Sequence, residues 1–77
     1  MTGRYAMIRV GWDDEAKVWF VEHSDIYGVF TEAESLDRLR AKIPVIIQDL
    51  MQDVEGRPDE IELDLIVHAR DRVRLAA

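Results

Sequence analysis

The sequence predicts a small α+β domain of two layers, in which one helix packs on a four-stranded sheet and the elements follow the order β-β-β-α-β. Three observations carry this prediction: alternating apolar residues near the start, a long apolar stripe at helical spacing in the middle, and a second alternating stretch near the end. A chain of 77 residues makes one domain. We expect its core to cover residues 4–69 and a basic tail to cover residues 70–77.

The first predicted strand covers residues 4–11 and has two unlike faces. Its side chains alternate between the faces because successive residues of a strand point to opposite sides. The two sets are Ala6, Ile8 and Val10 on one face, and Tyr5, Met7 and Arg9 on the other.

A short polar loop at residues 12–16 and a return strand at 17–23 predict a β-hairpin. Large apolar residues lie on both faces of the return strand, which favours a position inside the sheet. These residues are Val18 and Phe20 on one face, and Trp19 and Val21 on the other. Gly28 can form the sharp corner that follows, and residues 29–31 predict a short third strand.

The helix is predicted from about residue 36 to residue 54. Ser35 is its expected N-cap, because a serine hydroxyl can accept a hydrogen bond from the first turn. Gly56 and Pro58 follow where a helix terminator belongs. The apolar stripe consists of Leu36, Leu39, Ile43, Ile46, Ile47, Leu50 and Val54.

Pro44 interrupts the predicted helix, since it removes the hydrogen bond to the carbonyl of Arg40 at a cost of about 3 kcal/mol. Two separate helices that break near Ile43 are one outcome, and a single kinked helix is the other. We favour the kink, because the apolar stripe keeps its phase across the proline.

A fourth strand is predicted at residues 60–69, with Ile61, Leu63, Leu65 and Val67 on one face. A right-handed crossover through the helix places it parallel to the first strand, which gives the sheet order 3-2-1-4. The helix covers one face of this sheet. Tyr5 and Met7, together with either Trp19 or Phe20, are expected on the other face, which is a candidate surface for a dimer or another partner, with Tyr5 and Met7 as the candidate oligomer residues.

Charge limits the classes of partner. Net charge is −6, and residues 1–69 hold 7 basic and 15 acidic residues, a net −8. Such a body repels nucleic acid and attracts a basic protein. The alternative is that the charge only keeps the domain soluble. Cysteine is absent, and there is neither a signal peptide nor an apolar run long enough to span a membrane, so we expect a cytoplasmic protein with no membrane contact.

No catalytic, cofactor or metal motif is present. The two histidines, His23 and His68, fall at the ends of strands that are not predicted to be neighbours, so they do not predict a zinc site. Residues 4–12, which hold the first predicted strand, contain no carboxylate, whereas a two-metal nuclease with a fold of this kind needs one on its first strand. We therefore predict that the protein is not an enzyme and needs no cofactor or metal.

The hairpin and the corner resemble those of the HicB-like antitoxin family, specifically a short subfamily of it. The resemblance covers roughly residues 5–67 and is carried by Trp12, Asp13, Glu15, Ala16, Val18 and Trp19, and by Asp25, Ile26, Tyr27, Gly28, Thr31, Ser35 and Leu36. It implies a partial ribonuclease-H-like fold, that of the HicB N-terminal domain. It also implies binding and neutralisation of a small basic mRNA interferase of the HicA type. Typical members continue into a DNA-binding segment, whereas this sequence stops at Ala77, so direct contact with nucleic acid is not expected.

Candidate partner-binding residues are mainly acidic. Asp49 and Asp53 stand four apart near the negative end of the helix, an arrangement that costs stability. They therefore indicate a docking patch, or else a tolerated solvated face. Trp19 is either a partner contact or part of the core. The predicted set is Trp19, Asp49, Asp53, Glu60, Glu62 and Asp64.

Two functions follow as hypotheses. The first is a HicB-like antitoxin domain that acts by protein–protein contact. The second is a stand-alone structural or regulatory module that self-associates as a homo-oligomer. The sequence assigns no role to Arg70, Arg72 and Arg74.

Overall fold

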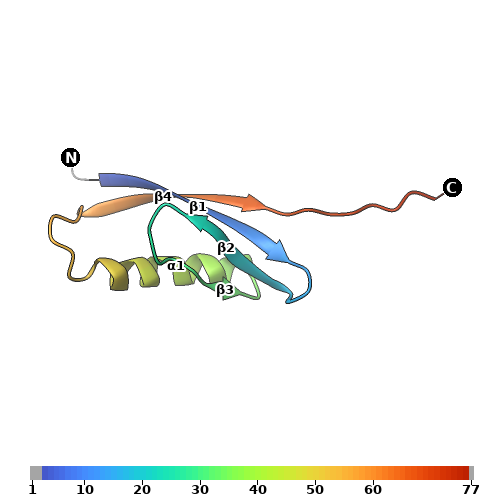
Figure 1. Cartoon of the computed structure of the whole chain (residues 1–77), viewed down its shortest axis with the longest axis horizontal. Helices are drawn as coiled ribbons and strands as arrows, with labels where there is room; N and C mark the ends of the chain where they lie inside the picture. The colour runs from blue at the N-terminus through green and yellow to red at the C-terminus, as the bar shows by residue number, and fades with distance from the viewer. Residues whose placement is uncertain (1–2, 77) are drawn as a thin grey trace.

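A computed structural model describes residues 3–76, so residues 1, 2 and 77 of the predicted domain lie outside the described range. Its sheet has the order β3-β2-β1-β4, as predicted, with β1 antiparallel to β2, β2 antiparallel to β3, and β1 parallel to β4 (Figure 1). The elements are β1 (Gly3–Asp13), β2 (Val18–Ser24), β3 (Glu32–Ala33), α1 (Leu36–Met51) and β4 (Glu60–His68).

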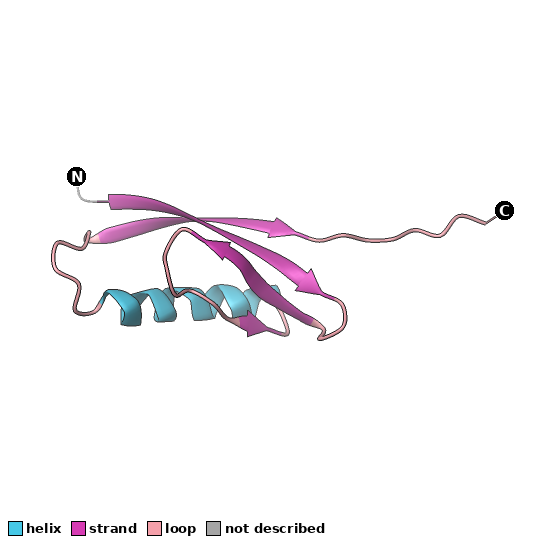
Figure 2. Cartoon of the chain, viewed as in Figure 1, coloured by secondary structure: helices cyan, strands magenta, loops and turns pink. Residues whose placement is uncertain are grey.

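The described chain has two layers, with α1 lying along one face of the sheet and no element over the other face (Figure 2). The backbone of α1 comes close to β2 and β3 and stays farther from β1 and β4. The core between the layers consists of Ile8, Val10, Val21, Val29, Ala33, Leu39, Ile43 and Ile47. Burial of these side chains supplies the main force that holds the two layers together.

The hairpin turn begins at Asp13, whose side-chain carboxylate accepts hydrogen bonds from the backbone N–H groups of Glu15 at 3.0 Å and Ala16 at 3.2 Å. This arrangement explains why an aspartate favours the first turn position. Lys17 closes the turn with φ 59°, and its N–H donates to the Asp13 carbonyl. Strand β1 is longer than predicted, so Trp12 belongs to it and not to the loop, whereas β2 has the predicted length and is shifted by one residue.

The third strand differs from the prediction. It covers Glu32–Ala33, whereas residues 29–31 were expected to form it. Gly28, with φ 95°, makes the predicted corner, but Val29 and Phe30 then donate their N–H groups within the loop, to Ile26 and Gly28. These local bonds occupy the donors that a strand ladder would need.

Helix α1 begins where predicted, with the Ser35 hydroxyl accepting a hydrogen bond from the backbone N–H of Arg38 at 3.1 Å. It continues through Pro44 without a break, so the two-helix alternative is wrong. It ends at Met51 and not near residue 54. The Arg57 side chain donates to the Met51 carbonyl at 3.0 Å and satisfies one acceptor that the helix end leaves free.

Strand β4 runs beside β1 in the predicted parallel direction, with Ile8 opposite Leu65 and Met7 opposite Asp64. Because opposite residues share a face, its apolar set points toward α1 as predicted. After β4, residues 69–76 adopt no regular structure and extend away from the body in the direction of the strand (Figure 1).

Candidate protein-binding surface

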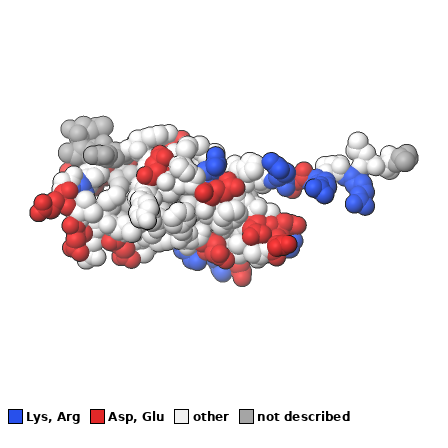
Figure 3. Space-filling model, viewed as in Figure 1, with Lys and Arg blue, Asp and Glu red and all other residues white. Residues whose placement is uncertain are grey.

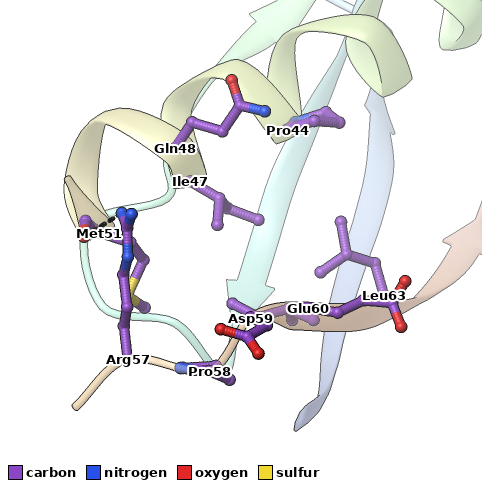
Figure 4. Close-up of a pocket in the computed structure, with 10 residues that line it drawn as sticks. Pro44, Ile47, Gln48, Met51, Arg57, Pro58, Asp59, Glu60 and Leu63 are labelled. Atoms are coloured by element: carbon purple, nitrogen blue, oxygen red, sulfur yellow. Dashed lines mark hydrogen bonds between the residues drawn. The ribbon is translucent and has the colours of Figure 1, made fainter. Parts of the chain in front are cut away.

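A hollow of about 410 Å³ opens between the end of α1 and the start of β4 (Figure 4). The helix backbone lies closer to β2 and β3 than to β4, so the side chains at the start of β4 are only partly covered. Ile47 and Leu63 point into the hollow from the helix and the strand. Arg57 lies across its end, where its guanidinium donates a hydrogen bond to the Met51 carbonyl. The hollow therefore combines apolar side chains from the helix and the strand with polar ones such as Arg57 and Glu60, as many protein-binding sites do.

A second hollow, of about 530 Å³, adjoins the first and shares Met51, Pro58 and Ile61 with it. Tyr27 and Leu50 also line it, and they are 95% and 40% exposed. An exposed tyrosine beside aliphatic side chains is a frequent anchor in protein interfaces. The two hollows together, here called the helix-end surface, form one continuous surface that is mainly apolar in the second hollow and mixed in the first.

Part of the predicted acidic set borders the helix-end surface. Glu60 lines the first hollow, Asp49 is exposed in the last turn of α1, and Asp53 is exposed two residues beyond the end of the helix. None of these three carboxylates forms an ion pair with another residue in the range 3–76. Figure 3 shows acidic side chains gathered at both ends of the body and basic ones along the tail.

Glu62 and Asp64 lie on the opposite, uncovered face of the sheet, beside Tyr5 and Met7. The Tyr5 hydroxyl donates a hydrogen bond of 2.6 Å to the Asp64 carboxylate, and this bond is the main reason that the pKa of Tyr5 is raised. The structure thus divides the predicted acidic residues between two surfaces instead of gathering them in one patch.

Trp19 faces the helix layer and not the open face. It is half-buried and packs against the core, and its ring lies 5.3 Å from that of Trp12, tilted by 57°. Phe20, opposite Gly11, is the aromatic residue of β2 that lies on the open face. The position of Trp19 fits a core role and leaves part of the ring at the surface.

Sequence reasoning missed a charged cluster on the open face. A β-bulge in β2 between the pairs Arg9–His23 and Val10–Val21 leaves Glu22 as the extra residue. Its carboxylate lies 3.3 Å from the Arg9 guanidinium and 3.9 Å from His68. Gly11 makes this possible, because a Cβ there would meet the Glu22 carboxylate at 2.5 Å. The signal was a glycine inside a strand.

Asp25 was also missed as a structural residue. Its carboxylate accepts a 2.8 Å hydrogen bond from the Met7 N–H and lies 3.3 Å from the His23 ring. The Met7 bond, followed by the His23 contact, lowers the pKa of Asp25. In the same way, bonds from Lys17 and Trp12 lower the pKa of Asp14 at the hairpin.

Within residues 3–76, no group of three or more histidine, cysteine, aspartate or glutamate side chains is placed to hold a metal ion. The helix of the described chain is too short and too polar to cross a membrane.

The fold and its surfaces define a small α+β domain with one helix over a four-stranded sheet. Residues 5–77 match the family described as a domain of unknown function, DUF1902, and the chain belongs to this family. It is also similar to the crystal structure of a hypothetical protein from the extremely thermophilic bacterium Thermus thermophilus. The identity is 32%, the TM-score is 0.64, and the match covers 94% of this chain and 100% of that one. No curated protein matches the chain.

Proposed function

We propose that this protein is a HicB-like antitoxin domain that binds and neutralises a small basic mRNA interferase of the HicA type. The resemblance of the hairpin and corner to that family supports the proposal. So does the strand order, which agrees with the partial ribonuclease-H-like fold that the resemblance implies. Neutralisation by contact needs no catalytic group.

The observation that carries the proposal is the helix-end surface, where apolar side chains of α1 and β4 lie near the carboxylates of Asp49, Asp53 and Glu60, and these three form no ion pair within residues 3–76. Asp49, Asp53 and Glu60 would meet lysine and arginine side chains with which the toxin contacts RNA. Tyr27 and Leu50 would supply the buried contacts that hold the complex. A toxin covered in this way could not reach its RNA.

The test uses a small basic protein encoded beside this gene, purified and titrated with the domain in low and high salt. We expect tight binding at low salt, weaker binding at high salt, and inhibition of RNA cleavage by the toxin. The variant Asp49→Asn/Asp53→Asn/Glu60→Gln should bind roughly tenfold more weakly or worse, because it removes three charges from the contact.

A matched control removes the same number of charges elsewhere. Glu15→Gln/Glu32→Gln/Glu34→Gln changes three exposed carboxylates at the hairpin and around β3. It should retain most of the affinity, because the binding depends on charges at the contact and not on the net charge of the domain. Equal losses in both triple variants would contradict the docking surface. A gene neighbourhood without any small basic protein would count heavily against the antitoxin role.

The uncovered sheet face supports a second candidate, the self-associating structural or regulatory module. Tyr5 is 66% exposed on this face, and Met7 is half-buried beside it. Light scattering of the purified protein tests this candidate, because a monomer at micromolar concentration would contradict it.

A further inference from the structure

The segment that follows β4, residues 69–76 and here called the tail, has the residue pattern of a strand but no partner among the described residues. Arg70, Arg72 and Arg74 stand at every second position, and the positions between and after them are Asp71, Val73 and Leu75, of which Val73 is 78% exposed and Leu75 is 84% exposed. Alternation of this kind is typical of a strand that buries one face and leaves the other in water. The tail therefore presents apolar side chains that the rest of this chain does not cover.

Strand β4 is the edge of the sheet, and its outer side pairs with no described strand. An unpaired edge offers a row of backbone donors and acceptors to another strand. The apolar face of β4 is also incompletely covered, because Ile61 and Leu63 are half-buried and line the first hollow. Both the edge and the face next to it are therefore open to an added strand.

The tail does not reach the outer edge of its own β4. It continues in the direction of the strand (Figure 1), and residues 69–76 contain no glycine, proline or asparagine that would favour a tight reversal. A second copy of the chain is then the nearest source of a complementary edge.

We propose that two copies of this chain pair antiparallel through residues 60–76, about a two-fold axis at His68, so that the tail of each copy adds a strand to β4 of the other. In this register Arg74 lies opposite Glu62 and Arg72 opposite Asp64. On the other face, Leu75 lies opposite Ile61.

The register matches chemistry on both faces, because directly opposite residues share a face. Basic residues of the tail meet acidic residues of β4 on the open side. Val73, opposite Leu63, covers half-buried apolar residues on the helix side. A slip of one residue would exchange the faces and place arginines over the apolar hollow, so the pattern specifies the register.

Overall charge favours the same pairing. Residues 70–77 carry three arginines and one aspartate, whereas residues 1–69 carry a net charge of −8. The pairs nearest the axis are less well matched, because Asp71 lies opposite Leu65 and Arg70 opposite Ile66. The outer pairs therefore supply most of the affinity.

Charge reversal gives a test with an internal control. Glu62→Lys and Arg74→Glu each place like charges opposite one another twice in a homodimer, and each should weaken dimerisation about tenfold. A mixture of the two variants places opposite charges at both positions and should restore dimers, seen as heterodimers by native mass spectrometry. Failure of the mixture to recover would contradict the register.

A cross-link tests the position of the axis, and it is clean because the protein has no cysteine. His68→Cys should form an intermolecular disulfide under mild oxidation, since the two residues face each other across the axis. Ile66→Cys is the control, because its two copies would lie roughly 13 Å apart along the strands at about 3.3 Å per residue. Equal cross-linking of both variants, or none in either, would overturn the proposal.

The dimer and the antitoxin role are tested separately, although the tail of a second copy would cover Ile61 and Leu63 of the first hollow. Val73→Asp/Leu75→Asp should abolish dimers and leave the helix-end surface intact, so the variant should still inhibit a toxin. Dimers that persist in this variant would contradict the tail exchange, whatever the result with the toxin.

Discussion

Strands β1 and β4 lie side by side and carry nearly the same alternating pattern, but they are buried to very different extents. Ile8 and Val10 of β1 are 0% exposed, whereas Leu65 beside Ile8 is half-buried and Val67 beside Val10 is 45% exposed. The difference follows from position, since β1 has a strand on each side and β4 is the edge of the sheet. An alternating pattern thus indicates which face is apolar, and its place in the sheet decides how far that face is buried.

The comparison predicts unequal costs for matched substitutions in opposite residues. Ile8→Ala should lower the free energy of unfolding by roughly 3–4 kcal/mol, because it leaves a cavity in a fully buried site. Leu65→Ala should lower it by only about 1–2 kcal/mol, because water already reaches that side chain. Urea denaturation of both variants measures the difference. Equal losses would show that β4 is covered as well as β1 in solution, for example by a second copy.

The loop that follows β2 and the loop that precedes β4 extend the comparison. Gly28 lies in the loop after β2 with φ 95°, and Gly56 lies in the loop before β4 with φ 72°. A Cβ at Gly28 would also press on Leu50 at 3.3 Å, whereas a Cβ at Gly56 meets nothing within 4 Å. Gly28→Ala should therefore cost about 2 kcal/mol and Gly56→Ala about 1 kcal/mol, measured by thermal unfolding. The reverse order would show that the β4 connection is the more tightly packed one.

The smallest effect concerns the side of β1 that faces β2. Asp25 accepts the Met7 N–H there, and its pKa in the folded protein is lowered mainly by this bond. A lowered folded-state pKa gives stability that is present above the unfolded value, about 4, and is lost as pH falls through the folded value. The difference in unfolding midpoint between wild type and Asp25→Asn should therefore be present at pH 7 and disappear below about pH 4.

Asp49→Asn is the control for this measurement, because the Asp49 carboxylate accepts no hydrogen bond among residues 3–76. It removes a carboxylate without removing a hydrogen bond from a backbone N–H. A midpoint difference for Asp25→Asn that does not change with pH would mean that the hydrogen bond to Met7 is not kept in solution.

Most of the fold could be predicted from local patterns. The faces of β1 and β4, the cap at Ser35 and the single helix follow from periodicity and hydrogen-bonding chemistry alone. The third strand could not be predicted, because residues 29–31 look extended and only the packing of Val29 into the core sets the loop. The end of the helix was missed because Val54 continues the apolar stripe, yet the chain turns after Met51.

The candidate site was harder to predict than the fold. Asp49 and Asp53 lie near the helix end and Glu60 lines the first hollow at the start of β4, but Glu62 and Asp64 lie farther along β4 on the open face of the sheet. The hollows depend on how far the helix lies from β4, which no local pattern specifies. The Glu22 cluster depends on a bulge whose position follows from pairing between strands and not from either strand alone.

The parallel pairing of β1 with β4 gives this domain a mechanical property. Gly3 begins one strand and His68 ends its neighbour, with paired positions along their whole common length. A pull on these two residues would load all of those hydrogen bonds in shear at the same moment instead of opening them one after another. The domain should therefore resist stretching between its first and last strands far better than peeling of the β1–β2 hairpin.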